Sequence, residues 1–433
     1  MMSKVDSDQR GAPPLAAGRA LRVPTSAALD LVAQAAMLLF ANGQTTEHME
    51  RAAEQLAEAL GYRAAIFPRW GELAVQIDGD SGPHYQVVPG APMNVDIRKV
   101  IATLNVIDEI CNGRMGTEAA RSDLEAVRQL PPLSLARFAL LATAGAMALG
   151  VIYGAADLVS LVLIGLSAGA GACLRRWLAT RSGNPFVQPF CAALVAGVIG
   201  AIVVHLHLGT LPDLVAVCPC MVLVPGAHFL NGSIDLARVR IALGIARIGY
   251  ASVIIVMICA GLLIGLSLGG VTLPVSEPFY RVPLGYDVIA AGVAVAAYGT
   301  FSSMPWKMLP IPVLIGMLAH AARWGVISIA GTRVELGALV ACLTVGSIVT
   351  PIANRMRLPF AAVAFASVVS LMPGIFLFRM AEGLVGLIAL QEKATSDLLI
   401  GTIADGGTAF LIILAIAFGL TFPNMYIERA GAP

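Results

Sequence analysis

From Arg137 onward the chain alternates between long apolar runs and short polar connections. A helix needs about 20 apolar residues to cross a bilayer core of about 30 Å, and about ten runs approach or exceed that length. This pattern predicts an α-helical polytopic membrane protein with about ten transmembrane helices. The runs lie at Phe138–Tyr153, Asp157–Cys173, Phe186–Leu206, Leu214–Val224, Ile241–Leu268, Tyr286–Met304, Leu309–Ala330, Leu336–Thr350, Pro359–Met372 and Leu398–Phe422.

Residues 24–130 follow a different pattern, which predicts a small soluble α+β domain. Helical spacing at both ends of this segment encloses three short runs rich in β-branched residues, which indicate an antiparallel meander. Residues 1–23 lack the apolar centre of a signal peptide and are expected to form a disordered tail. The predicted helices are Leu29–Leu39, Glu47–Leu60, Asn94–Cys111 and Thr117–Leu130, and the predicted strands are Tyr62–Trp70, Glu72–Asp78 and His84–Val88.

The two short apolar runs Leu214–Val224 and Pro359–Met372 both end at a Pro-Gly pair, Pro225-Gly226 and Pro373-Gly374. Proline lacks a backbone donor and glycine admits unusual backbone angles, so the carbonyls freed there need a partner other than lipid. A cavity for a polar substrate would supply one. The recurrence of the pair after the same number of runs predicts a 5+5 inverted repeat, as in many secondary transporters. Prolines that lie by chance near helix ends are the alternative.

These patterns divide the membrane part into a first five-helix repeat at 131–268, an external loop at 269–285, a second five-helix repeat at 286–425 and a tail at 426–433. The loop cations agree with this topology. With the soluble domain in the cytoplasm, nearly all of them fall on the cytoplasmic side, together with both termini. The exceptions are Arg281 and Arg333, and the cytoplasmic set is Arg175, Arg176, Arg181, Arg238, Arg240, Lys307, Arg355 and Arg357.

The composition indicates that most of the protein lies in lipid, and it argues against nucleic-acid binding and against a metal or cofactor. The chain is 58% hydrophobic and 13% charged, with a mean hydropathy of +0.81. A formal charge of +1 gives no basic field for nucleic acid. The seven cysteines lie mostly in apolar runs and are interpreted as core residues. No zinc spacing, P-loop or Gly-rich dinucleotide motif appears, so we expect no metal and no cofactor.

We expect the chemistry at the two breaks, because unwound helix ends offer N–H and carbonyl groups to a zwitterionic solute. Asp235 is the best partner for an ammonium group or a proton in the first half; a carboxylate paired with Arg238 or Arg240 is the alternative. Arg247 is its expected counter-charge and an anchor for a substrate carboxylate. The predicted substrate-binding residues are Pro225, Gly226, Asn231, Ser233, Asp235, Arg247, Pro373 and Gly374.

Asp405 lies among small residues in the last run, where an ionisable group is costly and usually functional. We therefore predict proton coupling through Asp235 or Asp405. Arg379 and Glu382 form a second half-site, although residues three apart also suit an exposed helical pair. His320 is a weaker candidate. His205 and His207 lie near a membrane edge, where a solvated histidine is the default.

At these residues the sequence resembles the threonine/serine exporter family of bacterial inner-membrane proteins. The resemblance covers nearly everything from Asp30 to Pro423, and Asn231 and Asp235 match the polar residues that follow the family's first Pro-Gly. The second half lacks that pair and has Arg379 and Glu382 instead. The matching stretches are Leu38–Gly43, Thr45–Glu50, Ser182–Phe186, Leu223–Gly226, Met304–Trp306 and Leu371–Gly374.

The resemblance implies export of threonine and serine across the inner membrane as proton antiport, driven by the proton motive force. The implied partners are a small amino acid, protons and the lipid bilayer, and a homo-oligomer is open. The rival is a membrane-anchored enzyme or sensor whose N-terminal domain carries the activity. Asp78, Asp80 and His84 would transfer protons in a hydrolase. Such residues are also common in turns, and no nucleophile motif accompanies them.

Overall fold

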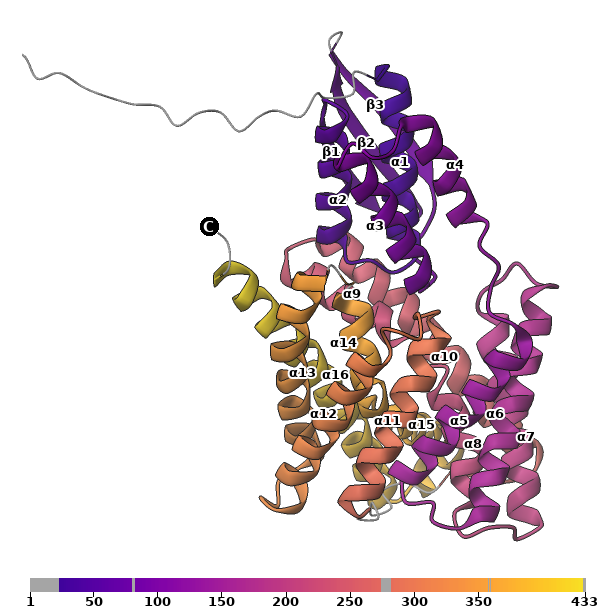
Figure 1. Cartoon of the computed structure of the whole chain (residues 1–433). Helices are drawn as coiled ribbons and strands as arrows, with labels where there is room; N and C mark the ends of the chain where they lie inside the picture. The colour runs from indigo at the N-terminus through magenta and orange to yellow at the C-terminus, as the bar shows by residue number, and fades with distance from the viewer. Residues whose placement is uncertain (1–22, 80–81, 274–281, 357, 359, 431–433) are drawn as a thin grey trace, which may run out of the picture.

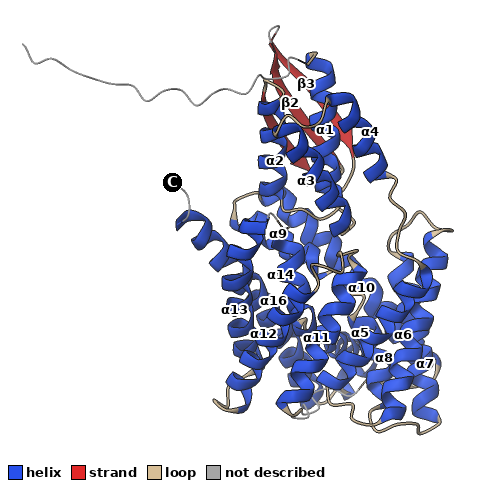
Figure 2. Cartoon of the chain, viewed as in Figure 1, coloured by secondary structure: helices blue, strands red, loops and turns tan. Residues whose placement is uncertain are grey.

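The protein consists of a small α+β unit stacked on one end of a large helical bundle (Figure 1). The structure is a computed structural model that describes residues 23–79, 82–273, 282–356, 358 and 360–430. Residues 1–22 of the predicted tail at 1–23 lie outside the described residues, as do Asp80, Arg281, Arg357 and residues 431–433. Strands occur only in the upper unit of the described chain (Figure 2).

The upper unit has its own hydrophobic core, in which Leu31, Phe40, Leu56 and Ile77 are fully or almost fully buried. Its strands pair antiparallel in the order β1-β2-β3, in agreement with the predicted meander. Gly43 and Gly61, which follow the first two helices, have φ angles of +92° and +89°, backbone that favours glycine. The elements are α1 (Thr25–Ala41), α2 (Thr46–Ala59), β1 (Arg63–Arg69), β2 (Glu72–Gly79), β3 (Gly82–Pro89), α3 (Ile97–Cys111) and α4 (Thr117–Arg128).

In the bundle, the described chain has 9 helices long and apolar enough to cross a membrane, or up to 10 if the bent pair α8 and α9 counts as one span. This agrees with a polytopic helical membrane protein. The helices are α5 (Leu135–Ile152), α6 (Leu158–Ala179), α7 (Val187–His205), α8 (Pro212–Met221), α9 (Gly226–Ala237), α10 (Ile241–Leu268), α11 (Leu284–Phe301), α12 (Pro310–Ser328), α13 (Val334–Met356), α14 (Phe360–Val368), α15 (Gly374–Leu390) and α16 (Ser396–Ala430), with short 3-10 turns η1 (Val369–Leu371) and η2 (Gln391–Lys393).

The segment after the second Pro-Gly pair lies outside the ten predicted apolar runs. It forms α15, a continuous helix that is apolar and long enough, with η2, to be a candidate span. Arg379 and Glu382 interrupt the apolar run in sequence but occupy only two positions of one helix. The remaining side chains keep the segment apolar, so the second half has a complete helix where the first half has the short α9.

The order of helix contacts in the first half recurs in the second. Helix α5 packs on α6, α6 on α7, α7 on α8 and on α10, and α9 on α10. The same sequence of contacts joins α11 to α12, α12 to α13, α13 to α14 and to α16, and α15 to α16. Helices α5 and α11 join the halves, and α16 ends at the side of the bundle that carries the α+β unit (Figure 1).

Glycines allow the closest helix contacts in both halves. A Cβ atom at Gly261 of α10 would lie 2.2 Å from the carbonyl oxygen of Phe190 on α7. At Gly346 of α13 a Cβ atom would lie 2.7 Å from the carbonyl oxygen of Gly419 on α16. Small residues permit such backbone approach between membrane helices, where packing and not water exclusion drives association.

We therefore expect Gly261→Ala to destabilise the bundle by about 2 kcal/mol, because the added methyl group would force α7 and α10 apart. The matched control is Gly249→Ala on the same helix, where the structure leaves a new Cβ in open space. Thermal unfolding of the two variants in detergent measures the difference. Equal melting temperatures would contradict the packing account.

Candidate functional site

The first break is a short irregular link between two half-helices. Helix α8 ends at Met221 and α9 begins at Gly226, with a bend of 50° between them. Pro225 has φ −83° and ψ 57°, and the Gly226 amide donates to the Val224 carbonyl at 2.9 Å. The helical hydrogen-bond ladder therefore stops here, and backbone groups of both half-helices are released inside the bundle.

The second break repeats this backbone geometry. Pro373 has φ −81° and ψ 40°, and the Gly374 amide donates to the Met372 carbonyl at 2.9 Å. It lies between η1 and α15, and the described residues from Ser370 to Phe376 are almost all buried. The two Pro-Gly pairs thus adopt similar conformations although their flanking sequences differ.

Each break packs against the half-helix that precedes the other one. A Cβ atom at Gly226 would lie 2.0 Å from the ring of Phe365 on α14, and one at Gly374 would lie 2.8 Å from the side chain of Met221 on α8. The absence of a side chain at both glycines is therefore required for the crossing. The structure brings the two predicted breaks together at the centre of the bundle, and whether they line a substrate path stays a prediction.

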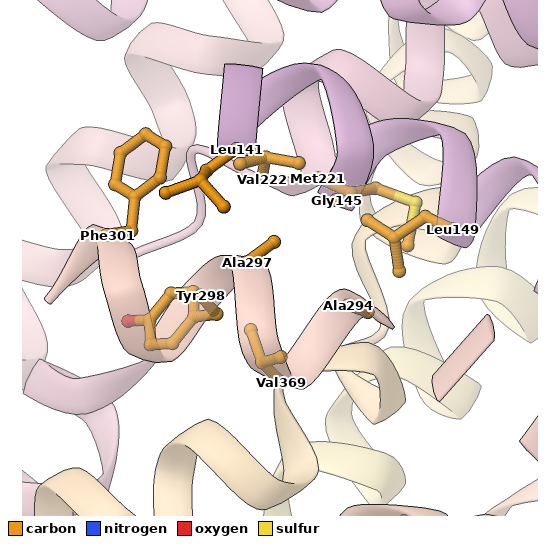
Figure 3. A pocket seen from close by; sticks show the side chains of 10 residues that line it. All are labelled: Leu141, Gly145, Leu149, Met221, Val222, Ala294, Ala297, Tyr298, Phe301 and Val369. Carbon is orange, nitrogen blue, oxygen red and sulfur yellow. The ribbon is translucent and has the colours of Figure 1, made fainter. Parts of the chain in front are cut away.

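A narrow cavity of about 20 Å³ opens beside this crossing (Figure 3). Met221 and Val369, from the ends of the half-helices, share it with Leu149 of α5 and with Tyr298 of α11. It is almost entirely apolar and holds little more than one water molecule. This cavity is thus too small for an amino acid in this conformation.

A larger hollow of about 270 Å³ lies between α9 and α16. Ser233 and Ala417 line it, and they also line a cavity of about 10 Å³ that reaches Gly226 and Met372. The predicted site residue Ser233 is therefore at the point where this surface hollow leads toward the crossing. Its hydroxyl donates to the Phe229 carbonyl at 2.8 Å.

Asp235 and Arg247 form a buried ion pair between α9 and α10. The Nε atom of Arg247 lies 3.4 Å from Oδ2 of Asp235, and their side chains are only 2% and 1% exposed. The expected counter-charge is thus in place, whereas Arg238 and Arg240, the alternative partners, pair with other carboxylates. Burying two charges costs several kcal/mol that their attraction repays only in part. Such a pair indicates a functional demand.

Several polar atoms around this pair have no hydrogen-bond partner within the described protein. They are both carboxylate oxygens of Asp235, Nε of Arg247 and the side-chain oxygen of Asn231. Buried polar groups are almost always satisfied, and exceptions need an explanation such as a bound ligand or water. The acceptors of Asp235 and Asn231 and the donor of Arg247 are the complement of a molecule with one ammonium and one carboxylate group.

The α+β unit closes this site from one end. Asn231 donates to the carbonyl of Gly43 at 3.2 Å, and Arg247 donates to the Thr46 hydroxyl at 3.5 Å. The Arg247 guanidinium also lies 5.5 Å from the centre of the Phe40 ring, within range of a cation–π contact. The link between α1 and α2 therefore forms a cover over the ion pair.

Two further ion pairs hold this cover, Arg238 with Glu47 and Arg240 with Glu50. All four side chains are partly exposed. Burial raises the pKa of Glu50, and the Arg240 guanidinium acts in the opposite direction. The desolvation of Glu50 thus offsets part of its attraction to Arg240. The Glu50–Arg240 contact therefore positions the α+β unit more than it stabilises the fold.

The predicted second half-site lies on α15 and α16. Arg379 and Glu382 are half-buried on α15, and Asp405 is buried on α16. Gly406, next to Asp405, packs on Met380, next to Arg379. The α15–α16 interface therefore carries these ionisable residues, as the α9–α10 interface carries Asp235 and Arg247.

The structure also contains a buried polar cluster that the sequence had only partly indicated. His320 of α12 is fully buried; its Nδ1 lies 3.0 Å from Oδ2 of Asp287 on α11, and its Nε2 lies 2.7 Å from the hydroxyl of Ser370 in η1. Arg323 lies 4.0 Å from Oδ1 of Asp287. Sequence reasoning missed Asp287 and Ser370. The available signal was an aspartate at the start of an apolar run, where a charge is costly.

The remaining candidates lie apart from these sites. His205 and His207 are exposed, as expected for a membrane edge, and Asp78 and His84 lie on strands of the α+β unit. Across the described residues, no group of three His, Cys, Asp or Glu side chains is arranged to hold a metal ion.

Apolar helices that surround broken half-helices and buried charges define this chain as a polytopic membrane protein of the transporter class. The chain belongs to the threonine/serine exporter family. Residues 30–269 match the family described as "Putative threonine/serine exporter", and residues 287–426 match that described as "Threonine/Serine exporter, ThrE". No solved structure matches the chain.

Charge reversal tests how the cover is held. Glu47→Arg should lower the melting temperature, because it places two cations together at the contact with Arg238. The double variant Glu47→Arg/Arg238→Glu should recover a coupling free energy of about 1 kcal/mol in a double-mutant cycle. The control is Glu72→Arg, whose partner Arg69 lies on the same exposed strand pair. Strict additivity of the Glu47 and Arg238 variants would show that the contact does not form.

Proposed function

We propose that this protein is a secondary transporter that exports threonine and serine across the bacterial inner membrane, driven by the proton motive force. Membership of the exporter family supports the class of transport. The observation that carries the proposal for this chain is the buried Asp235–Arg247 pair. The carboxylate oxygens of Asp235 and Nε of Arg247 lack hydrogen-bond partners within the described protein, while Nη2 of Arg247 donates to Thr46.

An ion pair of this kind suits a zwitterionic substrate. The ammonium group of threonine would bind the Asp235 carboxylate, and its carboxylate would bind the Arg247 guanidinium, so both buried charges remain compensated while the amino acid is bound. Asn231, one turn of α9 before Asp235, offers a polar group to a side-chain hydroxyl, whereas Ser233 lies on the side of α9 that faces α16. A substrate of one charge only would leave one member of the pair unpaired, which is unfavourable in a buried site.

The two halves of the bundle support alternating access. They share an order of helix contacts and a Pro-Gly conformation, and α9 and α15 leave the crossing toward opposite ends (Figure 1). We interpret them as a 5+5 inverted repeat, in which the Arg379, Glu382 and Asp405 region of the second half corresponds to the Asp235 and Arg247 region of the first. Rocking of one half against the other would open one region at a time.

We assign the end that carries the α+β unit to the cytoplasm, because the loop cations gather there. The cover formed by α1 and α2 then closes the cytoplasmic entrance, and both termini are cytoplasmic. In this assignment the conformation described above is closed on the cytoplasmic side by the cover and at the centre by the crossing.

Proton coupling requires a group that gains and loses a proton during the cycle. Asp235 and Asp405 are the proposed carriers in the two halves, because both are buried carboxylates on helices next to a break. Binding of the substrate ammonium at Asp235 would exclude a proton there, which is the competition that antiport requires.

The rival function is an enzyme or sensor anchored by the bundle. The contacts of the α+β unit argue against a separate catalytic role, because its α1–α2 link is committed to covering the buried pair. Asp78 lies on β2 and His84 on β3, where both occupy paired positions of the β2–β3 ladder.

Counterflow of labelled threonine in proteoliposomes tests the proposal. The wild-type protein should exchange threonine saturably, whereas Asp235→Asn and Arg247→Gln should lower exchange at least about tenfold, since losing one charge of a desolvated site costs 2 kcal/mol or more. Glu392→Gln, an exposed carboxylate in η2, is the control. Melting temperatures of all variants separate loss of binding from loss of folding. Absence of exchange by the wild type, or full exchange by both site variants, would refute the proposal.

A further inference from the structure

The side chains of Asp287, His320 and Ser370 form a continuous hydrogen-bonded chain inside the second half of the bundle. The chain joins α11, α12 and the η1 turn, which lies immediately before Pro373-Gly374. All three residues are buried, at 3%, 0% and 3% exposure. It therefore connects an ionisable imidazole to the side chain of Ser370, three residues before Pro373.

The partners fix how the ring is protonated. An ionised Asp287 carboxylate can only accept, so Nδ1 of His320 carries a hydrogen and donates to it. In the neutral ring Nε2 is then an acceptor, and the Ser370 hydroxyl donates to it. When the ring gains a proton, Nε2–H becomes a donor and Ser370 must become the acceptor. Protonation of His320 thus reverses the hydrogen bond that ties α12 to the second break.

Other charged and titratable groups surround the hydrogen-bonded side chains of Asp287, His320 and Ser370. Arg323 of α12 lies 4.0 Å from Asp287. Tyr153, at the end of α5, lies within electrostatic range of Asp287, Arg323 and Arg379, the last of which is on α15. On α13, Glu335 is paired with Arg333. Asp287 would attract an added proton on His320, and Arg323 would repel it.

The hydrogen-bonded side chains have one partly exposed neighbour. The Arg323 side chain is 25% exposed, whereas Asp287 beside it is only 4% exposed. Both lie near the end of the bundle opposite the α+β unit, since the other end of α11 contacts that unit through the Ile97 amide and the Ser302 carbonyl at 2.9 Å. Protons would therefore reach His320 from the side opposite the Asp235–Arg247 pair.

We propose that His320 is a further proton-binding group of this exporter, in addition to Asp235 and Asp405, and that its protonation state controls the second break through Ser370. The inference rests on the proposed export function and replaces neither Asp235 nor Arg247 as substrate ligands. One proton adds to Nε2 when movement of the η1 turn uncovers it and later leaves toward the cytoplasm, and no other covalent bond is made or broken. Because Ser370 covers Nε2, the proton can exchange only when the η1 turn moves, which links protonation to the conformational change.

The same three side chains resemble the serine, histidine and aspartate of a hydrolase in their order and spacing. A nucleophilic role needs access for an acyl substrate and donors for an oxyanion. Ser370 is buried against α12, so an acyl substrate has no access to it in this conformation. We therefore favour proton binding over a nucleophilic role. Labelling of Ser370 by a fluorophosphonate, which reacts with nucleophilic serines, tests this choice.

The deciding experiment compares exchange with gradient-driven flux in proteoliposomes. His320→Gln should retain threonine counterflow, which needs no net proton movement, but should lose the stimulation of uphill flux by an imposed pH gradient. Ser370→Ala should keep proton binding yet weaken the stimulation. His205→Gln, an exposed histidine, is the matched control and should behave as wild type.

A second measurement does not depend on the substrate. The infrared difference spectrum between about pH 5 and pH 8 should contain imidazole ring bands of a buried histidine that disappear in His320→Gln. If the wild type carries no threonine, the proposed function fails while this spectrum still decides whether His320 binds protons. The inference itself is overturned if His320→Gln keeps gradient-driven flux, if the bands are absent, or if a fluorophosphonate labels Ser370.

Discussion

The ion pair between Asp235 and Arg247 is the interaction on which the site depends. Two charges buried between α9 and α10 are tolerable only while each compensates the other. The first break lies at the other end of α9 from Asp235, and the α1–α2 link closes the space above the pair. A zwitterionic solute can replace the mutual contact without leaving either charge alone. Threonine and serine are such zwitterions, and the side-chain hydroxyl that both carry would contact the polar face of α9.

The second constraint is the crossing of the two breaks. Gly226 and Gly374 each lie against a large side chain of the opposite half, so neither half-helix can shift without moving the other. Polar groups lie on both sides of this crossing: Asp235 and Arg247 toward the α+β unit, and Asp287, His320 and Ser370 toward the other end. An exporter must couple events at its two faces, and a rigid crossing between two ionisable clusters provides a physical link for that coupling.

Much of the fold could be predicted from the sequence, because long apolar runs, Pro-Gly pairs and glycine stop signals are local features. The β1–β3 meander and the ends of α1 and α2 follow from such signals. Helix α15 was missed because Arg379 and Glu382 break its apolar run. The His320 cluster depends on contacts across 33 and 50 residues, which no local pattern contains. The docking of the α+β unit on α9 and α10 likewise follows from matching surfaces, such as Glu47 against Arg238, and not from periodicity.

The central claim is that threonine binds between Asp235 and Arg247. An experimental structure of the wild-type protein with bound threonine tests it most directly. The account predicts density for the amino acid between the two side chains, with the ammonium group at Asp235, the carboxylate at Arg247 and the direct contact between them opened. Threonine bound elsewhere while Asp235 and Arg247 remain in contact would contradict it.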